Sequence, residues 1–189
     1  MKENNPGLDL NTRLFAAVQK ETEALALVKD LILRGADIDV KDNDKGASTL
    51  LHKACSERNA GMVQLLLDHG ADVNAVSAYG ETAVHIAAAH GFADILELLI
   101  NNGGSINAKT NAGWTPLHEA CWQGRVAAAR VLFERGADPN ARDNNGATPL
   151  DKALSKDAYP FRREEIVDLF REYAPDLVME RFCTGGPGR

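Results

Sequence analysis

The spacing of apolar residues predicts short helices that follow one another in pairs. Leu117, Ala120 and Cys121 recur at intervals of three and four residues, which places them on one face of a helix. A second apolar group that includes Val131 and Leu132 follows within a few residues. Residues 116–135 are therefore predicted to form two consecutive helices.

Residues with special backbone preferences mark the ends of these two helices. Thr115 is a favourable N-cap, and Pro116 follows at the first helical position, where a missing N–H is tolerated. Gly124 and Gly136 follow the two apolar groups and can end the helices by adopting a positive φ. The sequence Asn-Asn-Gly at residues 144–146 then predicts a tight hairpin turn.

This helix–helix–turn unit recurs along the chain with a period of 33 residues. One motif starts at His52, His85 and His118 and continues with Asp151 in place of His, each 33 residues after the one before. A second motif of the same period starts at Gly70, Gly103 and Gly136. A fixed period in this range indicates a solenoid, in which each unit buries the apolar face of its neighbour.

We predict five units, at residues 8–41, 42–75, 76–108, 109–141 and 142–177. The first unit lacks the Thr-Pro-Leu-His motif. In the fifth unit, Ala174 stands where earlier units have the glycine that ends the second helix. Terminal units of a solenoid need polar outer faces, so such departures suit the two ends. Residues 1–7 are predicted to be a flexible N-terminal segment and residues 178–189 a C-terminal tail.

The run from Gly113 to Ala120 and the run from Gly70 to Ala75 closely resemble the ankyrin-repeat consensus. The resemblance covers about residues 8–177. It implies an all-α fold: an ankyrin-repeat solenoid of paired antiparallel helices with β-hairpin-like turns between repeats. It also implies a module that binds another protein, as an adaptor or inhibitor, and not an enzyme.

Composition narrows the class of partner only slightly. The 21 basic and 27 acidic residues give a net charge of −6, which argues against nucleic acid as a ligand. The sequence has neither an apolar stretch of about 18 residues nor a signal-peptide core near its start, so no membrane contact is expected. Three cysteines, an odd number, suit reduced thiols and a cytoplasmic location, or a nuclear one in a eukaryote.

The periodic histidines are not expected to bind a metal. Neighbouring repeats lie about 10 Å apart, whereas zinc ligands lie about 2 Å from the ion. The resemblance implies instead that each His bonds backbone groups of the neighbouring hairpin. Because nucleotide-binding and hydrolase motifs are also missing from the sequence, we expect no catalytic residues, no cofactor and no small-molecule substrate.

In the resembling family, partners dock on the hairpin tips and on the exposed side of the first helix of each repeat. The predicted partner-binding residues are Lys45, Glu57, Tyr79, Glu81, His90, Asn111, Trp114, Glu119, Trp122 and Gln123. We hypothesise that the three aromatic residues of this set form an anchor, since Trp and Tyr are common binding hot spots. The alternative is that Trp114 packs against its neighbouring hairpin within the chain.

Two further interpretations stay open beside a monomeric adaptor. The first is a scaffold that uses the C-terminal end as a second surface, through Phe161, Phe170, Tyr173 and Phe182. The second is a reader of a basic histone-like tail. The run from Ala112 to Cys121 resembles ankyrin domains that read the tail of histone H4, although Trp122 stands where those domains carry Asn.

Overall fold

A computed structural model describes residues 10–18, 24–42, 46–155 and 162–183. Within these residues the chain forms a series of short helices joined by tight turns. They are α1 (Leu10–Val18), α2 (Ala24–Leu33), α3 (Leu50–Ser56), α4 (Ala60–Asp68), α5 (Ala83–His90), α6 (Ala93–Asn101), α7 (Pro116–Trp122), α8 (Val126–Glu134), α9 (Pro149–Leu154), α10 (Arg163–Tyr173) and α11 (Pro175–Cys183).

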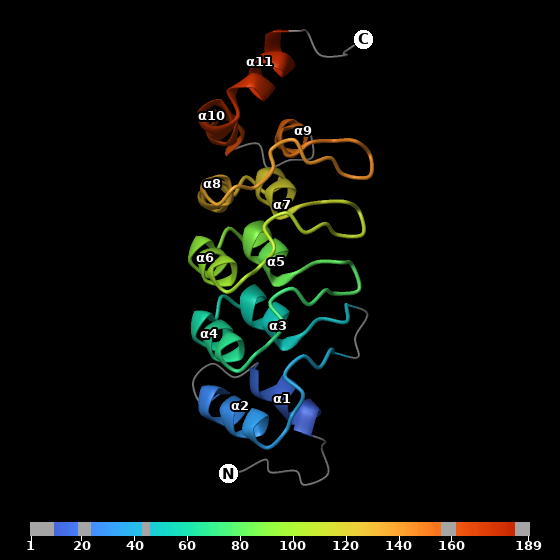
Figure 1. Ribbon diagram of the computed structural model, residues 1–189, viewed down its shortest axis with the longest axis vertical. Helices are drawn as coiled ribbons and strands as arrows, with labels where there is room; N and C mark the ends of the chain where they lie inside the picture. The colour runs from blue at the N-terminus through green and yellow to red at the C-terminus, as the bar shows by residue number, and fades with distance from the viewer. Residues whose placement is uncertain (1–9, 19–23, 43–45, 156–161, 184–189) are drawn as a thin grey trace.

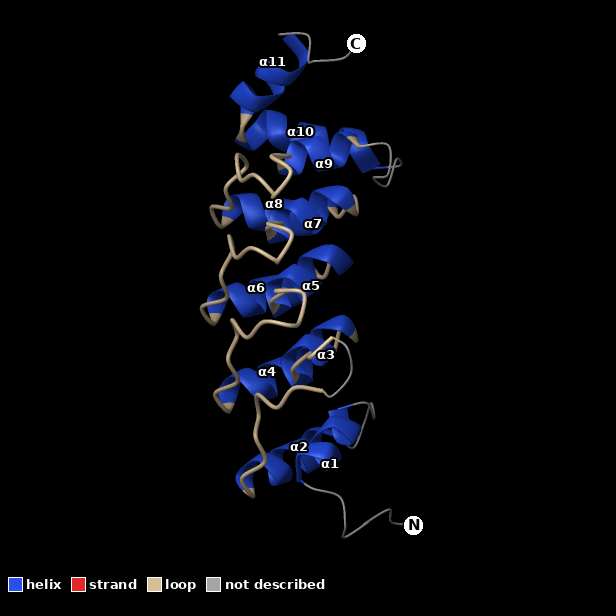
Figure 2. Cartoon of the chain, turned by 90° about the vertical axis from the view of Figure 1, so that its right-hand side faces the viewer, coloured by secondary structure: helices blue, strands red, loops and turns tan. Residues whose placement is uncertain are grey.

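The helices stack in two parallel columns, with hairpin-shaped loops projecting from one side (Figure 1). The inner column contains α1, α3, α5, α7 and α9, and the outer column contains α2, α4, α6, α8 and α10. The view turned by 90° shows the helix pairs as successive layers connected by loops (Figure 2). Among the described residues the only extended pairing is an isolated bridge between Lys41 and Thr49. The predicted all-α solenoid is confirmed.

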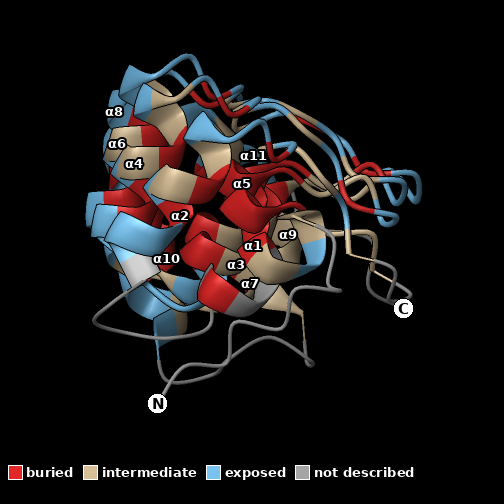
Figure 3. Cartoon of the chain, turned by 90° about the horizontal axis from the view of Figure 1, so that it is seen from below, coloured by how far each residue is buried: buried red, intermediate tan, exposed pale blue. Residues whose placement is uncertain are grey.

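The core lies between the two columns and between successive layers (Figure 3). Ala54 on α3 and Leu66 on α4 are completely buried, and the residues one period later, Ala87 and Leu99, are buried as well. Alanine on the inner helices allows neighbouring helices to approach closely, while leucine on the outer helices fills the space between the columns. Burial of each leucine side chain contributes about 1.5–3 kcal/mol, so stability is distributed over the whole stack.

Turns with a left-handed backbone separate the helices, as the glycines predicted. Gly124 and Gly136 have φ angles of 63° and 84°. Two residues that are not glycine occupy equivalent positions: Arg58 with φ 55°, one period before Gly91, and Ala47 with φ 44°, one period before Gly80. A residue with a Cβ atom is strained in this region, so these two turns are less favourable than their counterparts.

The C-terminal end differs from the prediction. The repeat domain was placed at residues 8–177, but α11 continues through this boundary to Cys183, and Val178 is buried. Pro175 begins the helix, since proline is favourable in the first helical turn. Asp151, which replaces His in the fifth unit, forms an ion pair with Arg181 of α11 at 3.0 Å. The predicted flexible segment at residues 1–7 lies outside the described residues.

The aromatic residues proposed as a second surface are used differently. Phe170 is completely buried and meets Phe133 edge to face at 5.0 Å. Tyr173 stacks on the same Phe133 ring at 5.2 Å. Phe161 and the side chain of Phe182 lie outside the described part of the structure. Phe170 is therefore part of the core that attaches α10 to α8, and it does not form a docking surface.

Candidate partner-binding surface

The three periodic histidines hold each hairpin against the preceding inner helix. The Nδ1 atom of His85 accepts the backbone N–H of Thr82 at 3.2 Å, and its Nε2 atom donates to the carbonyl oxygen of Trp114 at 3.0 Å. His52 and His118 make the same bonds, with Glu81 and Ala147 as the acceptors. The expectation that histidine bonds the neighbouring hairpin is confirmed, and both ring nitrogens are occupied.

Burial keeps these imidazoles neutral. Loss of hydration lowers the pKa of His85 to about 4, although its hydrogen bond to the Trp114 carbonyl acts in the opposite direction. Burial lowers the pKa of His52 and His118 as well. No group of three metal-ligating side chains occurs among the described residues. These histidines therefore position the backbone of Glu81 and Trp114, whose side chains belong to the predicted surface.

Trp114 and Trp122 lie against each other on the inner side of the fourth repeat. Their ring centroids are 5.5 Å apart, and the rings meet edge to face at 80°. The Trp114 ring also stacks on His118 at 6.2 Å and carries the ammonium group of Lys152 at 4.5 Å from its centroid. Both indoles are half-buried. Trp114 thus contacts side chains of α7 and α9 within the chain, whereas Trp122 contacts fewer charged and aromatic groups.

Lys152 is an important neighbour that the sequence analysis did not identify. Its ammonium group lies 2.7 Å from Asp143, whose side chain is completely shielded from solvent. Burial alone would raise the pKa of Asp143. The Lys152 ammonium and the backbone N–H groups of Ala147 and Asn145 outweigh burial and hold that pKa below its usual value. Lys152 lies one period after Glu119, so its place on the inner helix could be predicted from the sequence. Its contact with Asp143 could not.

Glu119 is the electrostatically unusual residue of the surface. It is half-buried on α7, and the loss of hydration raises its pKa to about 7. The negative charge of Glu81 raises the pKa further, and the positive charge of Lys152 lowers it only in part. Two carboxylates of the predicted set, Glu119 and Glu81, are therefore close enough to interact electrostatically, and Lys152 offsets their repulsion only in part.

Other predicted residues are engaged within the hairpins. Tyr79 is 60% exposed at a hairpin tip, and its carbonyl oxygen accepts the backbone N–H of Asn111 at 2.9 Å. The carboxamide of Asn111 donates to the carbonyl oxygen of Ala78 at 2.9 Å, so Asn111 joins two hairpins. No aromatic contact links Tyr79 to either tryptophan among the described residues. The tryptophans form a pair, and the third member of the predicted anchor stands apart.

The remaining predicted residues lie near the ends of the inner helices. Gln123 is the C-cap of α7, next to Trp122. Exposed Glu57 forms an ion pair with Lys53 at 3.4 Å. His90 stacks on Phe92 at 5.3 Å and is directed to that ring and not to the tryptophan pair. Lys45 lies outside the described residues.

Arg58 is a further surface residue that the sequence analysis missed. Its guanidinium group lies 5.2 Å from the centroid of the Phe92 ring and 3.5 Å from Asp94 of the next repeat. These contacts join two repeats and compensate in part for the strained backbone of Arg58.

None of the described helices is long and apolar enough to cross a bilayer.

A family model described as ankyrin repeats in three copies matches residues 14–110, 70–143 and 106–180. The B-cell lymphoma 3 protein homolog of Mus musculus is 44% identical over 72 residues, which are 38% of this chain and 15% of that protein. The ankyrin repeat and LEM domain-containing protein 1 homolog of Caenorhabditis elegans is 37% identical over 69 residues, which are 36% of this chain and 10% of that protein.

The potassium channel AKT1 of Arabidopsis thaliana is 40% identical over 68 residues, covering 36% of this chain and 8% of the channel. The chain therefore spans no more than 15% of the length of these curated relatives. Ankyrin repeats are generally protein–protein interaction modules and are typically not enzymes. The matched segments together extend over residues 14–180, and the chain belongs to the ankyrin-repeat family.

Proposed function

We propose that this chain binds a partner protein, as an adaptor or inhibitor, through the inner helices and hairpin tips. The main support for this proposal is the large aromatic side chain of Trp122. The equivalent positions of the neighbouring repeats hold Ser56, Ala89 and Ser155, so one large aromatic side chain stands in a row of small ones. An indole buries much apolar area at little entropic cost, which makes Trp122 the centre of the proposed contact.

Glu119 and Gln123 extend this contact along α7. Glu119 lies three residues before Trp122 and therefore next to it on the helix surface, and Gln123 follows at the helix end. Trp114 has a supporting role, because its contacts with Lys152 and His118 fix the edge on which Trp122 rests. A rigid aromatic surface loses little freedom on binding, which favours affinity.

Affinity purification followed by mass spectrometry tests the proposal. Wild-type chain is compared with Trp122→Ala and with Leu33→Ala, which removes a side chain that is 72% exposed on the outer helix α2. We expect a partner captured by wild type and by Leu33→Ala to be lost with Trp122→Ala. Circular dichroism confirms that each variant is folded. Equal capture by a folded Trp122→Ala variant contradicts the proposal.

A reader of a basic tail is the second candidate, and the interacting carboxylates of Glu119 and Glu81 favour it. Glu119 and Glu81 repel each other, and a lysine or arginine of a ligand would relieve this repulsion. Titration of an unmodified histone H4 tail peptide, followed by tryptophan fluorescence, tests this candidate. Saturable binding that weakens with Glu119→Gln supports it, and an unchanged fluorescence signal rejects it.

A further inference from the structure

Two successive pairs of hairpins are joined by the same set of hydrogen bonds. The backbone N–H of Asn111 donates to the carbonyl oxygen of Tyr79 at 2.9 Å, and that of Asn144 donates to Ala112 at 3.0 Å. The carboxamide of Asn111 donates to the carbonyl oxygen of Ala78, and that of Asn144 to the carbonyl oxygen of Asn111, both at 2.9 Å. Each of these hairpins thus offers two adjacent carbonyl oxygens to an asparagine of the next.

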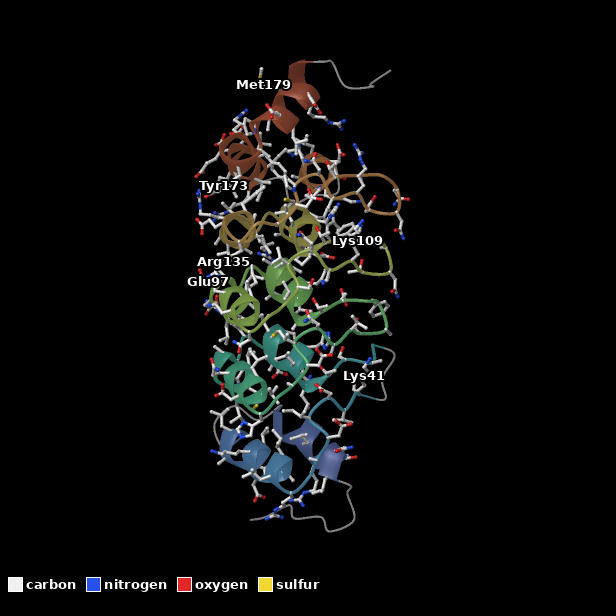
Figure 4. All side chains as sticks on the ribbon, viewed as in Figure 1. Lys41, Glu97, Lys109, Arg135, Tyr173 and Met179 are labelled. Carbon is white, nitrogen blue, oxygen red and sulfur yellow. The ribbon has the colours of Figure 1, made fainter. Side chains whose placement is uncertain are left out.

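A glycine completes this docking arrangement. A Cβ atom on Gly80 would lie 2.6 Å from the Oδ1 atom of Asn111, and one on Gly113 would lie 2.5 Å from the Oδ1 atom of Asn144. Any side chain at either glycine would collide with the incoming asparagine. Lys109, which projects on the hairpin side in Figure 4, adds a bond from its ammonium group to the carbonyl oxygen of Arg142 at 2.9 Å.

The last hairpin, residues 142–147, presents the same groups without an occupant among the described residues. It is the final loop of the hairpin column before α10 and α11 (Figure 1). The carbonyl oxygens of Asn144 and Asn145 accept no hydrogen bond from any described residue. No described atom lies within 4 Å of the position that a Cβ on Gly146 would take. All three residues are exposed.

Asp143 makes the last hairpin rigid. One carboxylate oxygen of Asp143 accepts the backbone N–H groups of Asn145 and Ala147, both at 2.9 Å. The other oxygen pairs with Lys152 at 2.7 Å. Arg142 adds a bond to the carbonyl oxygen of Gly146 at 2.8 Å. Because the hairpin is ordered before anything binds, little conformational entropy is lost when a ligand docks.

We propose that the outer edge formed by Asn144, Asn145 and Gly146 is a second docking site, which takes a hairpin loop of a partner protein. The chain's own hairpins define the required chemistry: an asparagine that donates its backbone N–H and its carboxamide to two adjacent carbonyl oxygens. The site is distinct from the contact centred on Trp122, because it uses the outer edge of the last hairpin and Trp122 has no part in it.

A peptide copy of an internal hairpin tests the site. The probe has the sequence of residues 109–114 between two cysteines, is cyclised by a disulfide, and is shown by its own NMR spectrum to form the turn. We titrate it into isotope-labelled full-length chain up to millimolar concentration. Amide shifts confined to residues 142–147 are expected, with binding about tenfold weaker for the peptide in which Ala replaces Asn111.

Two glycine variants of the chain provide the matched control. Gly146→Ala adds a methyl group in the docking space, and its φ of 79° makes the substitution strained. Gly136→Ala carries the same strain, with φ 84° and open space around it, at a position away from the edge. Peptide binding should be lost with Gly146→Ala and retained with Gly136→Ala and with Trp122→Ala.

Three outcomes would overturn the proposal. The first is the absence of shifts in residues 142–147 at the highest concentration of a peptide that forms the turn. The second is wild-type affinity in a folded Gly146→Ala variant. The third is concentration-dependent self-association that Gly146→Ala abolishes, since this result assigns the edge to a second copy of the chain. Retained peptide binding in Trp122→Ala separates this test from that of the proposed function.

Discussion

Lys152 places its ammonium group between the buried carboxylate of Asp143, at 2.7 Å, and the face of the Trp114 ring, at 4.5 Å. The side chain of Lys152 is only 16% exposed. One cation therefore holds the last hairpin, the tryptophan pair and α9 together, and it connects the two surfaces proposed to bind partners.

Removal of this cation should destabilise the chain strongly. Lys152→Met keeps most of the aliphatic stem but leaves Asp143 as a buried unpaired charge, which should lower the free energy of unfolding by about 3 kcal/mol. Urea denaturation measures the change. Lys53→Met is the control, because the ion pair of Lys53 with Glu57 is more exposed and is worth less than about 1 kcal/mol. Equal losses in the two variants would contradict the assigned role.

Relief of backbone strain should stabilise the second repeat. Ala47 has a φ of 44° where later repeats have glycine, so Ala47→Gly should raise the free energy of unfolding by about 1 kcal/mol. Thermal denaturation measures the shift in Tm. The reverse substitution Gly136→Ala, at a φ of 84°, should lower the Tm. A lower Tm for Ala47→Gly would show that the turn carries no strain.

Acid should destabilise the fold through His85. Its pKa is about 4 in the folded chain and about 6.5 in the unfolded chain, so the unfolded state binds more protons between these values. Stability contributed by neutral His85 is therefore complete above pH 6.5 and falls as the pH decreases toward 4, by about 3 kcal/mol. When the free energy of unfolding is measured by chemical denaturation and plotted against pH over this range, the slope should be smaller for His85→Gln than for wild type. An unchanged slope in that variant would contradict the prediction.

Glu119 should act in the opposite direction. Its pKa is about 7 in the folded chain against 4.5 for the ordinary side chain, so the folded state binds the extra proton between these values. The contribution to stability is complete below pH 4.5 and is lost as the pH rises through 7. Glu119→Gln should therefore raise the Tm at pH 8 and leave it nearly unchanged at pH 4.5.

The same substitution at Glu97, which is exposed on α6, separates this effect from a general change of net charge. Substitutions at such positions usually change the free energy of unfolding by less than about 0.5 kcal/mol. A Tm increase at pH 8 that is equally large for Glu97→Gln would show that Glu119 has no special environment.

Most of the fold was predictable because one period repeats the same local choices. Thr115, Pro116 and Gly124 define a helix by their own backbone preferences, and the recurrence of His at 33-residue intervals indicates the same packing in each layer. The bonds of His52, His85 and His118 were implied by the resemblance to ankyrin repeats. Local signals of this kind survive because each repeat contacts only its neighbours.

Contacts made by residues outside the repeated motifs were not predictable. Trp114 was identified as a surface aromatic residue, but the cation on its ring comes from Lys152, a residue 38 positions away whose direction no local pattern specifies. Helix α11 was missed because Ala174 was interpreted as the replacement for the glycine that ends a repeat, although Pro175 after it is a residue that can begin a helix.

The ion pair between Asp151 and Arg181 limits how such a chain can change in length during evolution. In earlier repeats a histidine at this position binds the carbonyl group of a following hairpin, whereas Asp151 binds a side chain of the closing helix. A duplicated repeat inserted before residue 142 would keep both arrangements intact. A repeat appended after α10 would meet an aspartate that cannot donate to its hairpin, so growth of the stack is expected in its interior and not at this end.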